Sequence, residues 1–226
     1  MNKTEFTQEH EQLLFGIPLF RDLPENVRTS LLDRLDFTVY DYYKKDILIK
    51  QNTPCKYLYV LLKGKLKVDI IDGNGSEVMI EHIVAPRAFA TPHLFNTDNT
   101  MPATFTAIED GLLFTATKES LFKLISEEPD ILLSFLKITG NCNRCTVRRL
   151  RSLSYKNVRA RFIAYLLEHK QNDKGEIHIE HNQAQLAEYL CLTRPALSKE
   201  INKMIKEGLI DMEGKTVTIS DSNKLK

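Results

Sequence analysis

The sequence predicts a protein of the α+β class, with strands and helices in successive parts of the chain. Between Thr38 and about Thr117, short runs with period two are separated by turn residues, as in a set of strands. From Pro129 to Leu153 the apolar period is that of one long helix. Beyond these lies a smaller module of helices and a hairpin. We therefore expect three parts, at residues 1–128, 129–154 and 155–226.

Bulk properties limit the class of protein. A chain of 226 residues is expected to form two domains, each with its own core. No apolar run approaches the roughly 18 residues that span a bilayer, and the polar start MNKTEFTQEHEQ lacks a signal-peptide core. We expect a cytoplasmic protein with no membrane partner. Its four cysteines show no disulfide-scaffold spacing and are expected to be reduced.

The net charge of +1 conceals an asymmetry between the two ends of the chain. Residues 147–226 hold 15 Lys and Arg against 10 Asp and Glu, a net charge of +5. Residues 1–146 hold the other 16 and 20, a net charge of −4. A basic C-terminal module on an acidic body is typical of a protein whose last third meets phosphates.

Residues 1–128 are predicted to begin with helices and continue as a jelly-roll-like β-roll. Residues 5–36 look helical with a break at Phe15–Phe20, after which Asp22 is expected to cap a second helix with Pro24 in its first turn. Two turn signals, at Lys63-Gly64-Lys65 and Asp72–Gly75, indicate hairpins. Many short strands at close spacing indicate a small roll or barrel. The expected strands are 47–49, 57–62, 66–70, 78–80 and 112–115, followed by a short helix at 118–125.

The long helix carries two stripes. One repeats at alternating intervals of four and three, as in a coiled coil with a polar middle: Leu132, Leu136, Thr139, Asn143, Thr146, Leu150 and Leu153. The second is expected to face the roll: Ile131, Phe135, Ile138, Cys142 and Cys145. A helix with two buried faces should pair with a second chain, so we interpret residues 129–154 as a dimerisation helix. The alternative is a long helix buried in a monomer.

The C-terminal module reads as a winged helix-turn-helix. Its first helix is expected to contain Val158, Phe162, Ile163, Leu166 and Leu167. Asn182 and Gln185 form a capping box, Cys191-Leu192 is the break, and Thr193 caps a second helix that Gly208 ends. Residues 209–212 and 216–219 then read as strands joined by a tight turn, and 176–179 alternates like a short strand.

The polar face of the second helix is the candidate nucleic-acid interface. Arg194, Ser198, Lys199 and Asn202 lie opposite the apolar stripe and carry donors suited to guanine edges and phosphates in a major groove. The alternative is an ordinary solvated face. With the wing included, we predict binding to double-stranded DNA. The expected contacts are Gln183, Thr193, Arg194, Pro195, Ser198, Lys199 and Asn202.

Three stretches resemble the Crp–Fnr superfamily of bacterial transcription regulators, over nearly the whole chain. They are the opening 17–23, the segment 57–68, which is similar to the roll's central hairpin, and the reader 186–210. The resemblance implies a homodimer on a near-palindromic site, with RNA polymerase as a partner for an activator. Arg194 and Lys199 align with basic positions that read bases or backbone in the family, and Ser198 with a position used by the Fnr branch. Many members have Glu where this chain has Pro195, so the preferred base there should differ.

The resemblance also locates an effector cassette, at 89–104. Cyclic-nucleotide members carry Gly-Glu-Leu and then Arg-Ser, which bind the ribose and the phosphate. Here those positions hold Ala90 and Thr91, then Met101 and Pro102. A buried phosphate without a cation would be poorly compensated, so we predict no response to cAMP or cGMP. An unidentified small-molecule effector is expected near Phe89, Ala90, Thr91, His93, Met101, Thr104 and Thr146.

Alternative sensing chemistries centre on two groups of residues. Haem could be held by His93 with His82 or Met101 nearby, although a lone histidine is more often a satisfied polar residue. Cys142 and Cys145 lie at i and i+3 on one helix face, where packing competes with a redox or metal role. No cysteine precedes Cys55, which argues against an N-terminal iron–sulfur cluster. No metal site is predicted.

The rival class is an enzyme with a jelly-roll active site. Such metal chemistry needs clustered His and Glu ligands, and the histidines show no paired spacing within the roll. We therefore predict that the chain is not an enzyme. A sensor acting only through partner proteins is the third alternative, and failure of the winged module to bind DNA would favour it.

Overall fold

The computed structural model describes residues 1–169, 176–179 and 181–220, and it leaves out the side chains of residues 143–146, 148–149 and 151–153. The chain divides into two compact units, Met1–Thr146 and Val147–Lys226. The division falls inside the long helix α5 (Pro129–Ser154), which has the bounds expected from the sequence. Its residues Asn143, Cys145, Thr146 and Leu153, to which the sequence assigned roles, have side chains outside the described part.

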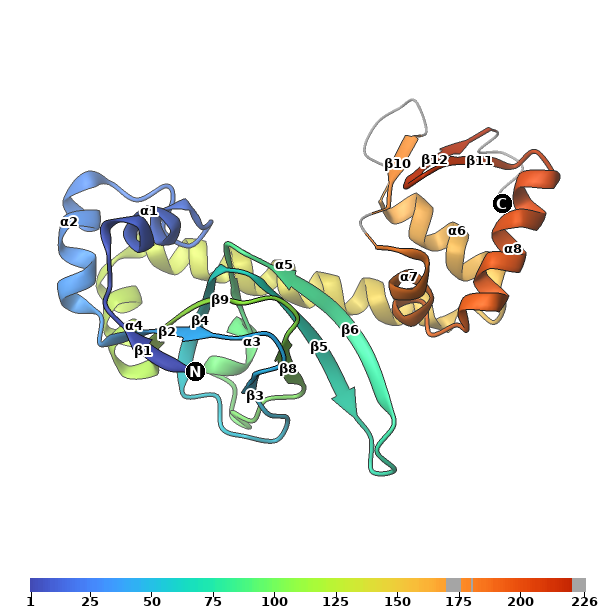
Figure 1. Cartoon of the computed structure of the whole chain (residues 1–226). Helices are drawn as coiled ribbons and strands as arrows, with labels where there is room; N and C mark the ends of the chain where they lie inside the picture. The colour runs from blue at the N-terminus through green and yellow to red at the C-terminus, as the bar shows by residue number, and fades with distance from the viewer. Residues whose placement is uncertain (170–175, 180, 221–226) are drawn as a thin grey trace. The chain divides into compact units, whose positions relative to one another are not determined.

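The first unit contains the predicted roll, built from two antiparallel sheets (Figure 1). One sheet has the order β1-β2-β9-β4-β7, formed by Asn2–Thr4, Phe37–Tyr42, Gly111–Thr117, Tyr57–Lys63 and Arg87–Phe89. The other has the order β3-β8-β5-β6, formed by Ile47–Ile49, Thr104–Ala107, Lys65–Ile71 and Glu77–Val84. Buried side chains of both sheets, among them Val60, Leu66 and Phe105, share one core. The mixed helix and strand fold predicted from the sequence is confirmed.

The turn signal at Lys63-Gly64-Lys65 was misinterpreted as a hairpin. β4 and β5 belong to different sheets, so this segment carries the chain from one sheet to the other. Gly64 has φ +91°, and a Cβ there would collide with the Tyr42 hydroxyl and lie 2.6 Å from the Asp110 carbonyl oxygen. Glycine is therefore required by the crossing and by close packing. The second turn signal does join a hairpin, β5 to β6.

The N-terminal region differs in detail from the prediction. β1 pairs with β2, α1 (Gln8–Gly16) is capped by Thr7 and His10, and α2 (Glu25–Arg34) follows. Asp22 does not cap α2, because Pro24 is the N-cap residue and makes no side-chain bond. Asp22 instead lies 3.3 Å from the Arg21 guanidinium. The expected buried face of α2 is confirmed, since Val27, Leu31 and Leu35 are all buried.

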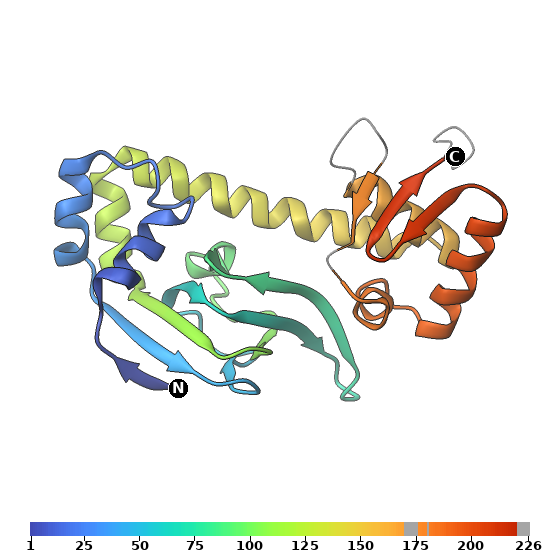
Figure 2. The same cartoon turned by 45° about the horizontal axis from the view of Figure 1, so that its top comes forward.

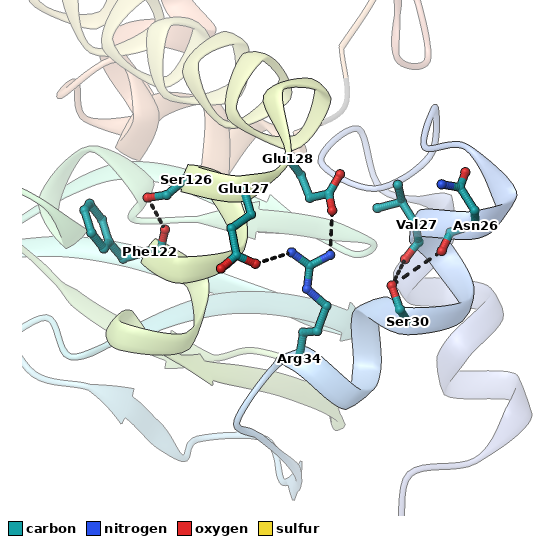
Figure 3. Close-up of polar contacts among 8 residues, drawn as sticks. All are labelled: Asn26, Val27, Ser30, Arg34, Phe122, Ser126, Glu127 and Glu128. Carbon is teal, nitrogen blue, oxygen red and sulfur yellow. Dashed lines mark hydrogen bonds and ion pairs between the residues drawn. The ribbon is translucent and has the colours of Figure 1, made fainter.

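Arg34 joins the end of α2 to the junction between α4 (Lys118–Glu127) and α5. Its guanidinium donates to Glu128 at 2.6 Å and to Glu127 at 2.8 Å (Figure 3). These two carboxylates stand 93 and 94 residues further along the chain. Arg34 therefore helps to fix where α5 begins on the roll.

The two predicted stripes of α5 behave differently in the single chain. Ile131 and Phe135 are buried in the roll's core, and Ile138 packs against it. Leu132, Leu136 and Leu150 of the seam are 39%, 57% and 64% exposed. The stripe toward the roll is thus confirmed for Ile131, Phe135 and Ile138, and the seam presents apolar side chains to solvent.

The described part of the second unit contains the end of α5, three further helices and a small sheet (Figure 2). The helices are α6 (Val158–Glu168), α7 (Gln183–Tyr189) and α8 (Arg194–Lys206), and the sheet has the order β10-β12-β11, formed by Glu176–His178, Thr216–Ile219 and Ile210–Glu213. Phe162, Leu166, Leu186, Ile201 and Val217 share its core. All five residues expected on this first helix lie on α6, where Phe162, Leu166 and also Tyr165 are buried, whereas Leu167 is 50% exposed.

Candidate nucleic-acid interface and effector region

The helix-turn-helix is held by the local capping hydrogen bonds that the sequence predicts. The Asn182 side chain accepts from the Gln185 backbone N–H at 2.9 Å, and the Gln185 side chain accepts in return from the Asn182 N–H. Thr193 caps α8 by accepting from the Ala196 N–H, and Pro195 stands in the first turn. Between the helices Cys191 has φ +51°, the left-handed conformation that reverses the chain.

The predicted DNA contacts of α8 gather on its solvent side. Leu197, Ile201 and Met204 are buried, so the opposite face is turned outward. Arg194, Pro195, Lys199 and Asn202 are exposed, as are Thr193 and Gln183, whereas Ser198 is half-buried. Within the described part of the chain, the side chains of Arg194, Lys199 and Asn202 make no hydrogen bond or ion pair. Their donors are therefore available to an external acceptor.

Arg159 holds α8 against α6, a role that sequence reasoning missed. Its guanidinium donates to Glu200 at 2.6 Å and forms an ion pair with Glu207 at 2.8 Å. The hydrogen bond from Arg159 holds the pKa of Glu207 below its ordinary value. Glu200 and Glu207 lie 41 and 48 residues beyond Arg159 in the chain, so no local sequence pattern predicts these two ion pairs.

Arg161 fixes the turn between α7 and α8, and it too was missed. One of its nitrogens, Nη1, donates to the carbonyls of Leu190 and Cys191 at 3.1 and 3.2 Å. Its Nε donates to the Tyr155 carbonyl at 2.8 Å, at the connection that precedes α6. A single guanidinium therefore satisfies carbonyls at the end of α7 and holds the turn on which α8 begins.

Side chains of the effector cassette pack into the core of the roll. Phe89 lies between Tyr59 and Phe105, with ring centroids 5.6 and 5.2 Å away. Met101 is fully buried, and Ala90 takes φ +56° as it begins α3 (Thr91–Leu94). Burial also lowers the pKa of the half-buried His93. These side chains occupy the space between the strands and the short helix.

Two of the expected effector residues, Thr91 and Thr104, line different hollows. Thr91 lines a hollow of about 330 Å³ with Leu19, Arg87, Ile138 and Cys142. Thr104 lines a different hollow of about 350 Å³, beside Lys45 and Lys67. Phe89, Ala90, His93 and Met101 line neither of these two, and the Thr146 side chain lies outside the described residues.

The residues weighed for haem or redox chemistry are spread over several elements. His82 lies on β6, His93 on α3, and Met101 is fully buried. Cys142 is half-buried on α5, and the Cys145 side chain is not described. Over the described part of the chain, no three His, Cys, Asp or Glu side chains gather as metal ligands.

Comparison with known proteins matches both units. Residues 40–128 match the family model of the cyclic nucleotide-binding domain, and residues 160–226 match that of the Crp-like helix-turn-helix domain. Across the residues that the structure describes, no helix is both long and apolar enough to traverse a membrane.

Curated relatives match the chain over most of its length, and solved structures share its fold. The CRP-like cAMP-activated global transcriptional regulator of Mycobacterium tuberculosis is 23% identical over 95% of this chain and 97% of its own. The electron transport regulator A of Shewanella oneidensis is 22% identical over 90% of this chain and 84% of its own. A CooA mutant from Carboxydothermus hydrogenoformans has a TM-score of 0.72 at 19% identity, covering 99% and 96% of the two chains. FixK2 from Bradyrhizobium japonicum has a TM-score of 0.62 at 17% identity, covering 84% and 95%.

The family models cover a sensor fold and a DNA-binding module in the order that the sequence predicts, and the curated relatives are transcription regulators rather than enzymes. The chain belongs to the Crp–Fnr superfamily and is a DNA-binding transcription regulator of that type.

Proposed function

We propose that the protein is a homodimeric regulator that reads a near-palindromic DNA site with α8 and responds to an effector other than cAMP. The observation that carries the proposal is the outward face of α8, on which the side chains of Arg194, Lys199 and Asn202 have no partner among the described residues. Two such helices about 34 Å apart would enter successive major grooves of one site. RNA polymerase is the proposed protein partner, and the bacterial cytoplasm the proposed location.

Within this proposal the residues of α8 divide by task. Arg194 lies in the first turn of α8. A guanidinium there reaches base edges and can donate two hydrogen bonds to one guanine, at O6 and N7. Lys199 carries a compact charge suited to a phosphate. Pro195 offers no donor or acceptor from its side chain, so the base opposite it is not read by a carboxylate.

The test is a set of gel-shift titrations on a selected operator at several salt concentrations. Arg194→Ala should lose discrimination between the operator and a base-substituted copy, at a cost of about 1–3 kcal/mol. Lys199→Ala should weaken binding to all sequences alike and lower the salt slope by about 1. Lys123→Ala, an exposed lysine of α4, serves as the charge-matched control. Unchanged binding by both α8 variants would refute the assignment.

The proposal against cAMP rests on the cassette. Relatives such as the Mycobacterium tuberculosis protein are described as cAMP-activated. At the positions that match the family's phosphate-binding pair, this chain has the buried Met101 and the exposed Pro102, and the rings of Tyr59, Phe89 and Phe105 stack nearby. A phosphate placed there would meet no cation from these positions. Calorimetric titration should therefore show no micromolar binding of cAMP, and such binding would overturn this part of the proposal.

The thiol or haem alternative for the effector has its own measurement. His93 is held half-buried in a state that favours the neutral imidazole, the form that coordinates iron. An absorption spectrum of protein from haem-supplied cells would show a Soret band if haem binds. Absence of that band, together with DNA binding unaffected by oxidant, would eliminate this alternative.

A further inference from the structure

The hollow between the roll and α5 has the features of a small-molecule site. It holds about 330 Å³ and is lined by the segment before α2, the end of β6 with β7, and α5. Its residues are Pro18, Leu19, Val84, Pro86, Arg87, Ala88, Thr91, Ile138, Asn141 and Cys142. All of them belong to the first compact unit. The size is at the lower end for ligand pockets, which suits a molecule smaller than a nucleotide.

Two polar side chains that line this hollow, Thr91 and Asn141, have donors that no described residue accepts. Thr91 is only 4% exposed, yet its hydroxyl has no hydrogen bond to any residue that the structure describes. The Thr91 oxygen is not a fully buried atom, so it can be reached from the hollow that Thr91 lines. The exposed amide of Asn141, on α5, is likewise unbonded within the described chain. Both groups line the same hollow.

Arg87 gives the hollow a positive charge, and its ion pair with Glu81 reduces that charge. Its Nη1 and Nη2 donate to the two oxygens of Glu81 at 3.0 and 3.5 Å. A guanidinium has about five N–H donors, so several remain without a protein acceptor among the described residues. Glu81 offsets much of the positive charge. The Glu81 carboxylate repels a phosphate dianion more strongly than it repels a singly charged acceptor, so a monoanion fits this balance better.

The remaining lining is apolar. Leu19 and Ile138 contribute to or pack against the roll's core, and Pro18 and Pro86 add rigid apolar surface. Val84, the last residue of β6, is 51% exposed and adds apolar surface to the lining. An apolar tail seated here would remove this surface from water.

We propose that this hollow binds a small monocarboxylate with an apolar tail. The head group accepts from Arg87, the Thr91 hydroxyl and the Asn141 amide, and the tail lies against Pro18, Leu19 and Val84. Because Asn141 and Ile138 belong to α5 and the other groups to the roll, the bound molecule ties α5 to the roll. As the effector of the regulator this assignment rests on the proposed function, but the binding itself does not.

The test uses the full-length protein and hexanoate as the probe, with 1-hexanol as the matched molecule that lacks the carboxylate. Calorimetry should show saturable binding of hexanoate and at least about tenfold weaker binding of 1-hexanol, because hydrogen bonds to a charged group are lost. Equal affinities would overturn the head-group assignment. Absence of hexanoate binding would overturn the proposal.

Variants locate the site. Thr91→Val removes the unbonded hydroxyl and keeps the shape, so the protein should stay as stable while hexanoate binds about tenfold more weakly. Arg87→Met should weaken hexanoate and leave 1-hexanol unchanged. Thr106→Val, at the other hollow, is the matched control and should bind like the wild type. Unchanged hexanoate affinity in Thr91→Val would place the ligand elsewhere and refute the site.

DNA binding separates this inference from the proposed function. Gel shifts with the unliganded wild-type protein measure DNA binding alone. A protein that binds hexanoate through Thr91 but shifts no DNA would refute the proposed function and support the site. A protein that shifts DNA but does not bind hexanoate would support the proposed function and refute the site.

Discussion

Side chains at helix ends show how single residues position the DNA-binding face. Asn182 and Gln185 satisfy the first N–H groups of α7, and Thr193 does the same for α8. Each cap contributes about 1 kcal/mol and, more usefully here, sets the residue at which the helix begins. Since Arg194 is the first residue of α8, the Thr193 cap also determines where the Arg194 guanidinium points.

His93 gives a prediction of pH dependence. Burial lowers the pKa of His93 below its ordinary value of 6.5, so the unfolded chain binds the proton more tightly than the folded one. The stabilising contribution is therefore present above about pH 6.5 and decreases as the pH falls below it. Urea denaturation at about pH 8 and pH 5.5 should show a smaller loss of stability in His93→Gln than in the wild type.

The control for this titration is His178→Gln, which changes an exposed histidine of β10. That variant should lose stability with falling pH as the wild type does. If His93→Gln also follows the wild-type curve, the buried imidazole makes no contribution and the prediction is wrong.

At the scale of elements, the turn between α7 and α8 depends on a residue from a third helix. Arg161 of α6 donates to the Leu190 and Cys191 carbonyls and to that of Tyr155. Arg161→Met keeps the aliphatic stem but leaves these carbonyls without their donor. We expect a loss of about 1–3 kcal/mol in the free energy of unfolding, measured in urea.

The same variant should affect recognition beyond its effect on stability. With the turn released, α8 is less well oriented, so the ratio of operator to non-specific affinity should fall while the salt slope stays the same. Arg161→Lys, which keeps the charge and loses the planar fork, should lie between wild type and Arg161→Met. An unchanged affinity ratio in Arg161→Met would reduce Arg161 to a purely structural role.

At the scale of the whole molecule, the seam of α5 leaves apolar side chains in solvent. Leu132, Leu136 and Leu150 are exposed in the single chain, at positions that match a coiled-coil repeat. A second copy covering this seam is the simplest way to bury them. Leu136→Glu should therefore give a monomer in sedimentation equilibrium and abolish binding to a two-half-site operator.

Lys137→Glu is the matched control for this substitution, because it introduces the same side chain at the adjacent exposed position, off the seam. It should remain dimeric. A Leu136→Glu protein that sediments as a dimer would show that the seam does not hold two chains together.

Periodicity and caps in the sequence determined most elements of this protein, because both are local properties of the chain. The bounds of α5, the capping box of α7, the Thr193 cap and the wing all follow from residues within a few positions of one another. The polar face of α8 follows from the same helical spacing. The strands missed by the sequence, β1, β2, β7 and β8, are mostly short, so their pairing depends on neighbours distant in the chain.

Only the tertiary structure decided the contacts between distant segments. It placed β4 and β5 in different sheets, joined at Gly64, which lies close to the Tyr42 hydroxyl. It brought Arg159 and Arg161 to α8 and its turn, and it gathered Arg87, Thr91 and Asn141 around one hollow. Such contacts are set by packing and by the need to satisfy buried polar groups, and these act across separations that no sequence period records.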